Sequence, residues 1–359
     1  MILRVPFYYK EFHCIADACK DSCCIGWEID IDEDTFDYYK SIEGDFGKRL
    51  RSHMVSEDVN SFVLEKNGWC PFLNEKKLCD ICIELGEEAL SEVCTEYPRF
   101  TTEYPKTREK VLCLSCGEVG RIVFSDTETI GFDEQILSED YDEYEWEEGD
   151  DELAEKLEAV RAHAIGLLQD RTHSITERIA MYLDYCCQMQ KELFETAPKT
   201  EEPEKISLYE AFLQRLSQYE ELESIGDAWS DMEDRLKNFY NEENYEKTHR
   251  AFMESQKENE YQYEHLMVYY TFRYFMRAFY DNNLLEKAQF AVASFLMVRD
   301  MDVMVWMENG QKFDLSDRVE TTKVYAKEVE HSEENIEMLG ESFLFEDVFS
   351  VKDLFAQIM

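Results

Sequence analysis

The pattern of hydrophobic positions divides the chain into two parts. From residue 153 onward, apolar residues recur every three or four positions, as on the buried face of an amphipathic helix. Leu153, Leu157, Val160, Ala164 and Leu168 are the first such series. Before residue 138 the pattern is irregular, with short extended stretches between helix-like segments. We therefore predict a mainly α protein, with an irregular α-rich module carrying minor β over 1–137 and an α-helical domain over 153–359.

Local signals place helices in the second part. Ser174 and Ser207 each stand three residues before a glutamate, the capping-box pattern that opens a helix. Polar segments bracket a helix over 284–307, and another is expected over 316–339. The most apolar stretch, Phe290 to Met307, contains Arg299, Asp300 and Asp302, so we do not expect it to span a membrane.

Shorter elements are expected in the first part. Residues 27–31 alternate like a short strand, residues 34–40 read as a helix start, and residues 84–94 suit a short helix that stops at Tyr97-Pro98. Few continuous apolar stripes occur here. The stability of this module is therefore expected to depend on its cysteines more than on a large hydrophobic core.

The charge balance narrows the class of partner. The chain carries 80 acidic and 37 basic residues, a net charge of −43. The electrostatic field of such a charge repels phosphate backbones and attracts cationic proteins. Nucleic acid is therefore excluded as a partner, and lysine-bearing proteins are favoured. The alternative is that the acidic residues only increase solubility. Residues 138–152 include ten Asp or Glu, and this self-repelling block is predicted to be a solvated linker.

The first 13 residues indicate in which cellular compartment the protein is expected. Met1 to His13 lacks a long apolar run and is interrupted by Arg4, Lys10 and Glu11, which is unlike a secretory signal. A cytoplasmic location is therefore expected, where thiols stay reduced and cysteine clusters more often bind metal than form disulfides.

Cysteine is concentrated at one end of the chain. Ten of the 12 cysteines lie within the first 116 residues. The CxxC pairs Cys79–Cys82 and Cys113–Cys116 could form a four-thiolate zinc site, and four thiolates equally suit a [4Fe–4S] cluster. The spacing indicates a metal without naming it. Cys186 falls among core positions of a helix and is expected to be a buried, inert thiol.

Several motifs together resemble the flagellin lysine N-methylase family. They are Cys14-x4-Cys19-x3-Cys23-Cys24-x-Gly26-Trp27, Cys70-Pro71-Phe72-Leu73, Leu78-Cys79, Leu85-Gly86, Cys94-x2-Tyr97-Pro98-Arg99, Leu114-Ser115-Cys116-x-Glu118, Phe272-Arg273-Tyr274-Phe275, Arg299 and Glu330-His331-Ser332-Glu333-Glu334-Asn335. The resemblance spans most of the chain, and its cysteine framework is shared with zinc- or iron-chelating CxxCxxCC-type domains.

The resemblance implies an enzyme, a protein-lysine N-methyltransferase. It would transfer methyl groups from S-adenosylmethionine to flagellin lysines and carry a cysteine-bound [4Fe–4S] cluster, with zinc as the alternative metal. The cysteines that match the family, and are therefore the expected metal ligands, are Cys14, Cys19, Cys23, Cys24, Cys70, Cys79, Cys94 and Cys116. Cys82 and Cys113 lie where the family does not usually have cysteine, which counts against the paired-CxxC zinc site.

Catalytic and cofactor-binding residues are not assigned by the sequence. Gly117-x2-Gly120 is not a GxGxxG loop and lacks a βαβ context, so the methyl-donor pocket is expected to be unconventional. The candidates for the catalytic site, chosen by residue type, are Tyr97, Glu264, Tyr269, Tyr270 and Tyr274. The alternative interpretation is that they are ordinary core aromatic or helix-surface residues. The alternative function is a non-enzymatic, metal-stapled adaptor or redox sensor. The oligomeric state is not predicted.

Overall fold

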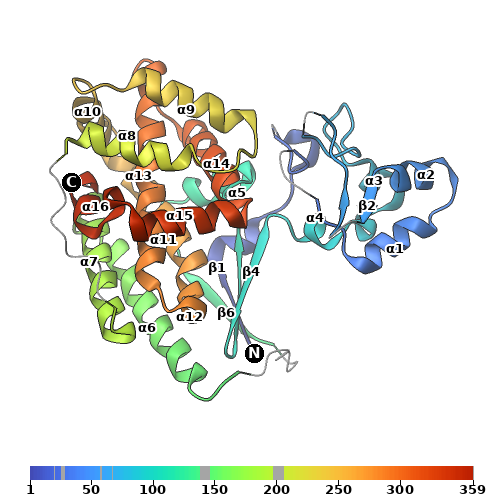
Figure 1. Cartoon of the computed structure of the whole chain (residues 1–359), viewed down its shortest axis with the longest axis horizontal. Coiled ribbons are helices and arrows are strands. Elements are labelled where there is room, and N and C mark those ends of the chain that lie inside the picture. Colours follow the sequence, from blue (N-terminus) through green and yellow to red (C-terminus); the bar gives the residue numbers. More distant parts are fainter. Residues whose placement is uncertain are drawn as a thin grey trace. The chain divides into compact units, whose positions relative to one another are not determined.

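The computed structural model describes residues 1–19, 21–25, 29–56, 59–66, 68–137, 146–196 and 206–358 (Figure 1). These residues are mainly helical with a minor β component, which confirms the predicted secondary-structure class. The chain forms two compact units. The helical unit comprises Met1–Glu11, Thr101–Ser115 and Val119–Met359, and the cysteine unit comprises Phe12–Phe100 and Cys116–Glu118.

These units divide the chain differently from the expected modules 1–137 and 153–359. Strands at both ends of the first 137 residues belong to the helical unit. A buried ion pair is one of the contacts that join these strands to the helices: Arg161 Nη1 of a long helix lies 2.6 Å from Glu109 Oε2 of a strand. Of the expected linker 138–152, residues 138–145 lie outside the described part, and the first helix after it begins at Asp150.

A four-stranded sheet forms one part of the helical unit. Its strands are β1 (Ile2–Pro6), β4 (Arg99–Tyr104), β5 (Thr107–Leu112) and β6 (Phe132–Ile136). The first two residues of β4, Arg99 and Phe100, belong to the cysteine unit. The order is β4-β5-β1-β6, with β1 parallel to β5 and antiparallel to β6. Sequence analysis missed these strands.

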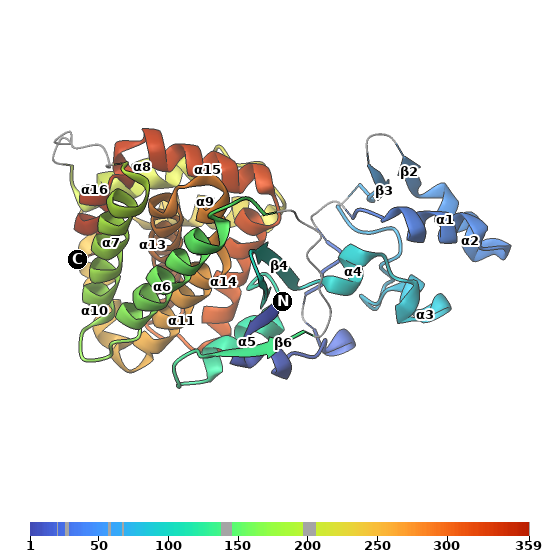
Figure 2. The same ribbon diagram turned by 90° about the horizontal axis from the view of Figure 1, so that it is seen from below.

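The long helix α13 (Leu284–Glu308) is the core of the helical unit. Nearly every residue from Leu284 to Met304 is buried, as expected for a helix that is apolar all round. Figures 1 and 2 show it among other helices. These are α5 (Gly117–Ser125), α6 (Asp150–Leu168), α7 (Ile175–Phe194), α8 (Leu208–Tyr219), α9 (Asp227–Phe239), α10 (Tyr245–Ser255), α11 (Glu260–Tyr274), α12 (Ala278–Asp281), α14 (Leu315–Glu330), α15 (Glu333–Phe345) and α16 (Val351–Ile358). No helix in the described part of the chain is long and apolar enough to cross a membrane.

Most local helix signals are confirmed. Ser174 and Ser207 both form complete capping boxes, at the starts of α7 and α8. The single helix expected over 316–339 is wrong, because the chain leaves the helix at His331 and Ser332 caps a new one, α15. The tail after it is also helical, in α16.

The cysteine unit contains short elements. They are α1 (Glu33–Ser41), α2 (Gly44–Ser52), the hairpin β2 (Met54–Ser56) and β3 (Asn60–Phe62), α3 (Asp80–Leu85) and α4 (Glu92–Glu96). Single 3-10 turns complete the chain at Phe7–Glu11, Ala16–Ala18, Glu87–Ala89, Lys257–Asn259, Phe275–Arg277 and Asp347–Phe349.

Two secondary-structure elements of this unit differ from those predicted from the sequence. The helix predicted over 84–94 is broken by Gly86, whose φ of 97° lies in the region that favours glycine. The expected strand 27–31 is described only from Ile29, and Asp30 forms an isolated antiparallel bridge with Ser61. The core of the unit includes Phe36, Tyr39, Phe62 and Phe72, with Cys70 among them.

Candidate functional sites

Three tyrosines considered from the sequence converge on one carboxylate. The hydroxyls of Tyr269, Tyr270 and Tyr274 donate to Glu330 at 2.8, 3.2 and 2.9 Å. Arg273 forms an ion pair with the same carboxylate. All five side chains are buried, so the carboxylate already has a full set of donors, and this cluster belongs to the core.

Glu264 has a structural role as well. Its carboxylate is fully buried and accepts hydrogen bonds from Arg171 and Arg178, the latter at 2.6 Å. Tyr97 precedes Pro98 through a cis peptide bond at the end of α4. None of these five candidates, Tyr97, Glu264, Tyr269, Tyr270 and Tyr274, lines either of two surface cavities in the helical unit.

Four of the eight expected metal ligands lie together in the cysteine unit. The thiols of Cys23, Cys70, Cys79 and Cys94 interact electrostatically in every pairwise combination. Burial, together with the neighbouring thiols, raises the pKa of Cys70 to about 12 and that of Cys94 to about 11. In this environment free thiols stay protonated at neutral pH.

The other expected ligands differ in their surroundings. Cys24 Sγ lies 4.0 Å from Cys23 Sγ, Cys14 is exposed, and Cys19 and Cys116 are partly exposed. Cys82, which the family pattern does not include, lies near Cys79 and Cys14.

Cys113 and Cys186 lie in the helical unit. Cys113 is buried, accepts a hydrogen bond from Ser115 Oγ at 2.9 Å, and has Glu330 and Arg273 as charged neighbours. Cys186 is fully buried, which confirms the expected core position.

The cysteine set fits an iron–sulfur cluster in its chemistry. Among the residues described, no group of three or more His, Cys, Asp or Glu side chains is arranged to bind a single metal ion. In a [4Fe–4S] cluster each cysteine binds a different iron, so the sulfur atoms stand farther apart than around one zinc ion. Four mutually neighbouring thiols, of which Cys23 is exposed and the other three are buried or partly buried, match that donor set.

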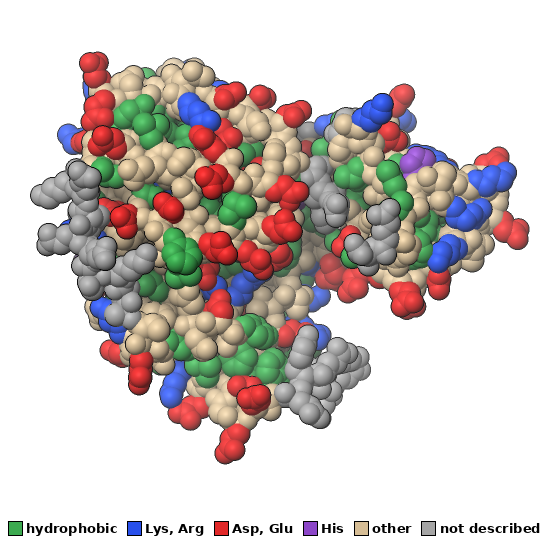
Figure 3. Space-filling model, viewed as in Figure 1, with side chains coloured by type: hydrophobic (Ala, Val, Ile, Leu, Met, Phe, Trp, Pro, Cys, Tyr) green, Lys and Arg blue, Asp and Glu red, His purple; other side chains and the backbone are tan. Residues whose placement is uncertain are grey.

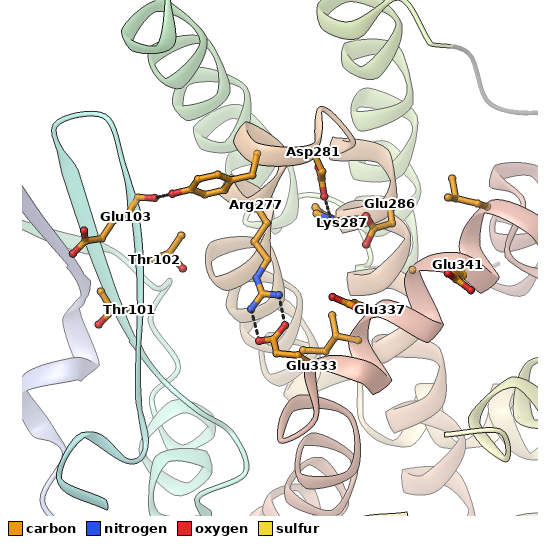
Figure 4. Close-up of a pocket in the computed structure, with 14 residues that line it drawn as sticks. Thr101, Thr102, Glu103, Arg277, Asp281, Glu286, Lys287, Glu333, Glu337 and Glu341 are labelled. Atoms are coloured by element: carbon orange, nitrogen blue, oxygen red, sulfur yellow. Dashed lines mark hydrogen bonds and ion pairs between the residues drawn. The ribbon is translucent and has the colours of Figure 1, made fainter. Parts of the chain in front are cut away.

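A surface groove in the helical unit is rich in carboxylates (Figure 4). We call it the acidic groove. It has a volume of about 650 Å³ and is lined by Thr101, Thr102, Glu103, Arg277, Tyr280, Asp281, Glu286, Lys287, Glu333, Ile336, Glu337, Gly340, Glu341 and Leu344. Figure 3 shows Asp and Glu side chains gathered over the part of the unit that carries α15. The lining contains six carboxylates and two cations.

Both cations of the acidic groove already have carboxylate partners. Arg277 binds Glu333 through two hydrogen bonds, which lower the pKa of Glu333. Lys287 pairs with Asp281 at 2.5 Å and with Glu286. Burial raises the pKa of Glu286.

Two glutamates of the acidic groove have no ion-pair partner in the part of the chain that the structure describes. Glu337 and Glu341 are exposed and have no hydrogen-bond or ion-pair partner within the described ranges. The groove therefore presents uncompensated negative charge to any ligand.

Sequence analysis missed the acidic groove, although one signal was available. Glu333, Glu337 and Glu341 recur every four residues, which places three like charges on one face of α15. Such i,i+4 pairs of like charge weaken a helix by a few tenths of a kcal/mol each. A row of glutamates that lowers the stability of its own helix indicates a binding site for a cationic ligand.

The family assignment comes from the C-terminal half. The model of a family described as "FliB lysine N-methylase C-terminal domain" matches residues 161–357, more than half of the chain. The chain belongs to the FliB lysine N-methylase family. The resemblance inferred from the motifs is thereby confirmed.

Individual relatives of this family share shorter segments. The "Lysine-N-methylase" of Salmonella typhimurium is 29% identical over 145 residues, covering 37% of this chain and 35% of that protein. The "Flagellar biosynthetic protein FliU" of Salmonella muenchen is 30% identical over 143 residues, covering 36% of this chain and 81% of that protein. The chain thus spans about a third of the length of the lysine-N-methylase it matches. No solved structure matches this chain.

The FliB match contains most of the acidic groove. All of its lining residues from Arg277 to Leu344 lie within 161–357, whereas Thr101 to Glu103 and the cysteine unit lie before that range. The part of the chain that carries the family identity is therefore the part that carries the groove.

Proposed function

We propose that this chain transfers methyl groups from S-adenosylmethionine to lysine ε-amines of flagellin. Membership of the FliB lysine N-methylase family supports methylation of protein lysines, and the flagellar name of one relative supports a flagellar substrate. The observation that carries the proposal is the acidic groove within the matched range, because uncompensated carboxylates favour a lysine-bearing protein surface.

The acidic groove is the docking surface for the substrate in this proposal. Glu337 and Glu341 are exposed and attract ammonium groups. Tyr280, 59% exposed, and Leu344, 49% exposed, supply apolar surface for the methylene stems of lysine. Exposed charges of this kind act mainly on association and specificity.

The transfer step requires a neutral amine. The lysine nitrogen attacks the methyl carbon of the sulfonium, the C–S bond breaks as the C–N bond forms, and the amine proton passes to a base. Lysine has an ordinary pKa of about 10.4, so desolvation or a nearby proton acceptor must lower the cost of deprotonation. S-adenosylhomocysteine and methyllysine are the products.

Cys23, Cys70, Cys79 and Cys94 hold the [4Fe–4S] cluster in this proposal. The mutual proximity of these four thiols supports the assignment. A bound cluster supplies a redox-active iron centre. Binding iron favours the thiolate form and thereby overcomes the burial that keeps Cys70, Cys79 and Cys94 protonated.

One assay tests this proposed function. Anaerobically purified protein is incubated with flagellin and S-adenosylmethionine labelled in the methyl group, and tryptic peptides are analysed for label on lysine. Label on lysine supports the proposal. Absence of label from protein with a full iron complement, despite binding of flagellin, would instead support the non-enzymatic adaptor.

A further inference from the structure

One wall of the acidic groove is the open edge of a β-sheet. The strand order β4-β5-β1-β6 places β4 at an edge, and within the described residues no strand lies beyond it. An edge strand has one row of backbone N–H and C=O groups without a neighbouring strand. Thr101, Thr102 and Glu103 of this strand line the groove, and Thr101 is exposed.

A hydrogen bond shows which backbone groups of β4 point away from the sheet. The hydroxyl of Tyr280 in α12, which also lines the groove, donates to the backbone oxygen of Glu103. The two-residue connection between β4 and β5 makes this pair antiparallel. In such a pair, both backbone groups of one residue point to the same side, and that side alternates along the strand. Thr101 and Glu103 therefore point outward, and Thr102 points toward β5.

The helix α15 supplies charge across the groove from this edge. Figure 4 shows Thr101 to Glu103 on a strand on one side and Glu337 and Glu341 on a helix opposite. Both glutamates are exposed and have no ion-pair partner among the described residues. An extended chain beside β4 would place its side chains alternately on the two faces of the sheet. A lysine among them has a stem long enough to extend toward these carboxylates.

We propose that an extended, lysine-bearing segment of the substrate protein binds in the acidic groove as an added strand on β4. This inference rests on the proposed function, which makes the groove the docking surface for the substrate. The backbone of the segment bonds to the outward groups of Thr101 and Glu103. Main-chain hydrogen bonds then supply affinity, and the carboxylates opposite select lysine among the side chains.

Tyr280 covers this sheet edge until the substrate binds. An N–H of the added strand takes the place of the Tyr280 hydroxyl on the oxygen of Glu103, and exchange of one hydrogen bond for another changes the free energy little. The Tyr280 ring lies 5.2 Å from that of Phe279, and 59% of Tyr280 is exposed. The hydroxyl can therefore leave Glu103 with little loss of buried surface.

Hydrogen exchange of the unaltered protein tests the strand addition. Exchange at single amides of the anaerobically purified full chain is measured by mass spectrometry, with and without saturating flagellin. We expect the amides of Thr101 and Glu103 to exchange at least about 5-fold more slowly in the complex, because each becomes a hydrogen-bond donor to the added strand. The amide of Thr102 already faces β5 and should change less. A lysine-containing segment of flagellin should also slow.

Two variants of one residue separate the backbone from the side chain. Proline has no N–H and is tolerated on an edge strand where the N–H faces solvent, so Thr101→Pro keeps the bonds between β4 and β5 and prevents addition of a strand. Thr101→Val keeps the N–H and the shape of the side chain. The Kd for flagellin, measured by calorimetry, should rise at least about 5-fold in Thr101→Pro and stay unchanged in Thr101→Val.

The outcomes separate this inference from the proposed function. Unchanged exchange of Thr101 and Glu103 on binding of flagellin, or equal affinity of the two variants, overturns the strand addition. If Thr101→Pro does not fold, the exchange measurement on the unaltered protein decides alone. If flagellin lysines are still methylated when the strand addition fails, the proposed function stands. Absence of both flagellin binding and methylation would contradict both.

Discussion

Arg277 Nη1 and Nη2 bind the two carboxylate oxygens of Glu333 at 2.9 and 3.0 Å. This bidentate pair neutralises the first glutamate of the row on α15, which lies between the strand residues Thr101 to Glu103 and the other two glutamates of the row (Figure 4). Glu337 and Glu341, one and two turns farther along, have no such cation among the residues that the structure describes. The charge available to a substrate therefore lies on these two residues.

Removing that charge should weaken substrate binding. We expect Glu337→Gln/Glu341→Gln to raise KM for flagellin several-fold with little change in kcat, because exposed charges each contribute up to about 1 kcal/mol. KM for the unaltered enzyme should also rise with ionic strength. Steady-state methylation kinetics at two salt concentrations measure both effects.

The matched control lies on the same helix. Glu334 is exposed on α15 but does not line the groove, so Glu334→Gln should leave KM unchanged. Equal effects of Glu334→Gln and the double variant would show that only net charge matters, and would contradict the docking role of the groove.

If Cys23, Cys70, Cys79 and Cys94 hold the cluster, replacing one of them should remove the iron, whereas replacing another cysteine should not. Cys70→Ala and Cys94→Ala should each lose the iron and the broad absorption near 400 nm of anaerobically purified protein. Cys82→Ala and Cys186→Ala should keep both, because neither belongs to the four mutually neighbouring thiols. Iron retained in Cys70→Ala, or zinc in place of iron in the unaltered protein, is the result that the assignment does not allow.

The Glu330 cluster predicts a large effect on stability. Glu330→Ala should lower the free energy of unfolding by about 3–5 kcal/mol, because it removes the buried carboxylate that forms an ion pair with the buried Arg273. Glu333→Gln removes a more exposed partner of an arginine and should cost less than about 1 kcal/mol. Urea denaturation measures both. A small effect of Glu330→Ala would mean that the cluster is not the core element described.

Glu328 should make stability depend on pH. Burial raises the pKa of this carboxyl from 4.5 to about 8, despite hydrogen bonds from the backbone N–H of Ile225. Between these values the folded state binds a proton that the unfolded state releases, so this contribution to stability is present below pH 4.5 and is lost as pH rises through 8. Glu233 and Glu223 lie nearby and add to the shift.

The measurement is Tm across this pH range. Glu328→Gln has no ionisable group at this position, so the decline of its Tm from pH 5 to pH 9 should be shallower than that of the unaltered protein. Parallel curves for the two proteins would show that Glu328 does not ionise in this range.

The sequence predicted elements whose signals are local. The capping boxes at Ser174 and Ser207 satisfy the helix N-terminus within four residues, so they are readable from the sequence alone. Helix α13 was also predicted, since its apolar run lies between two polar segments. The break at Ser332 was missed because the apolar spacing continues on both sides of it.

The candidate sites depend on contacts between distant segments. β1 pairs with β5 more than a hundred residues later, and no local pattern indicates that partner. The cysteine framework was readable as spacing, and the fold was needed to bring Cys23, Cys70, Cys79 and Cys94 together.

The central claim is that this chain methylates lysine on flagellin, and mass spectrometry of flagellin after anaerobic incubation with methyl-labelled S-adenosylmethionine tests it most directly. We expect label on lysine side chains, lost when S-adenosylmethionine is omitted and reduced in Glu337→Gln/Glu341→Gln at limiting flagellin. Unlabelled lysines after incubation with iron-loaded protein would contradict the account.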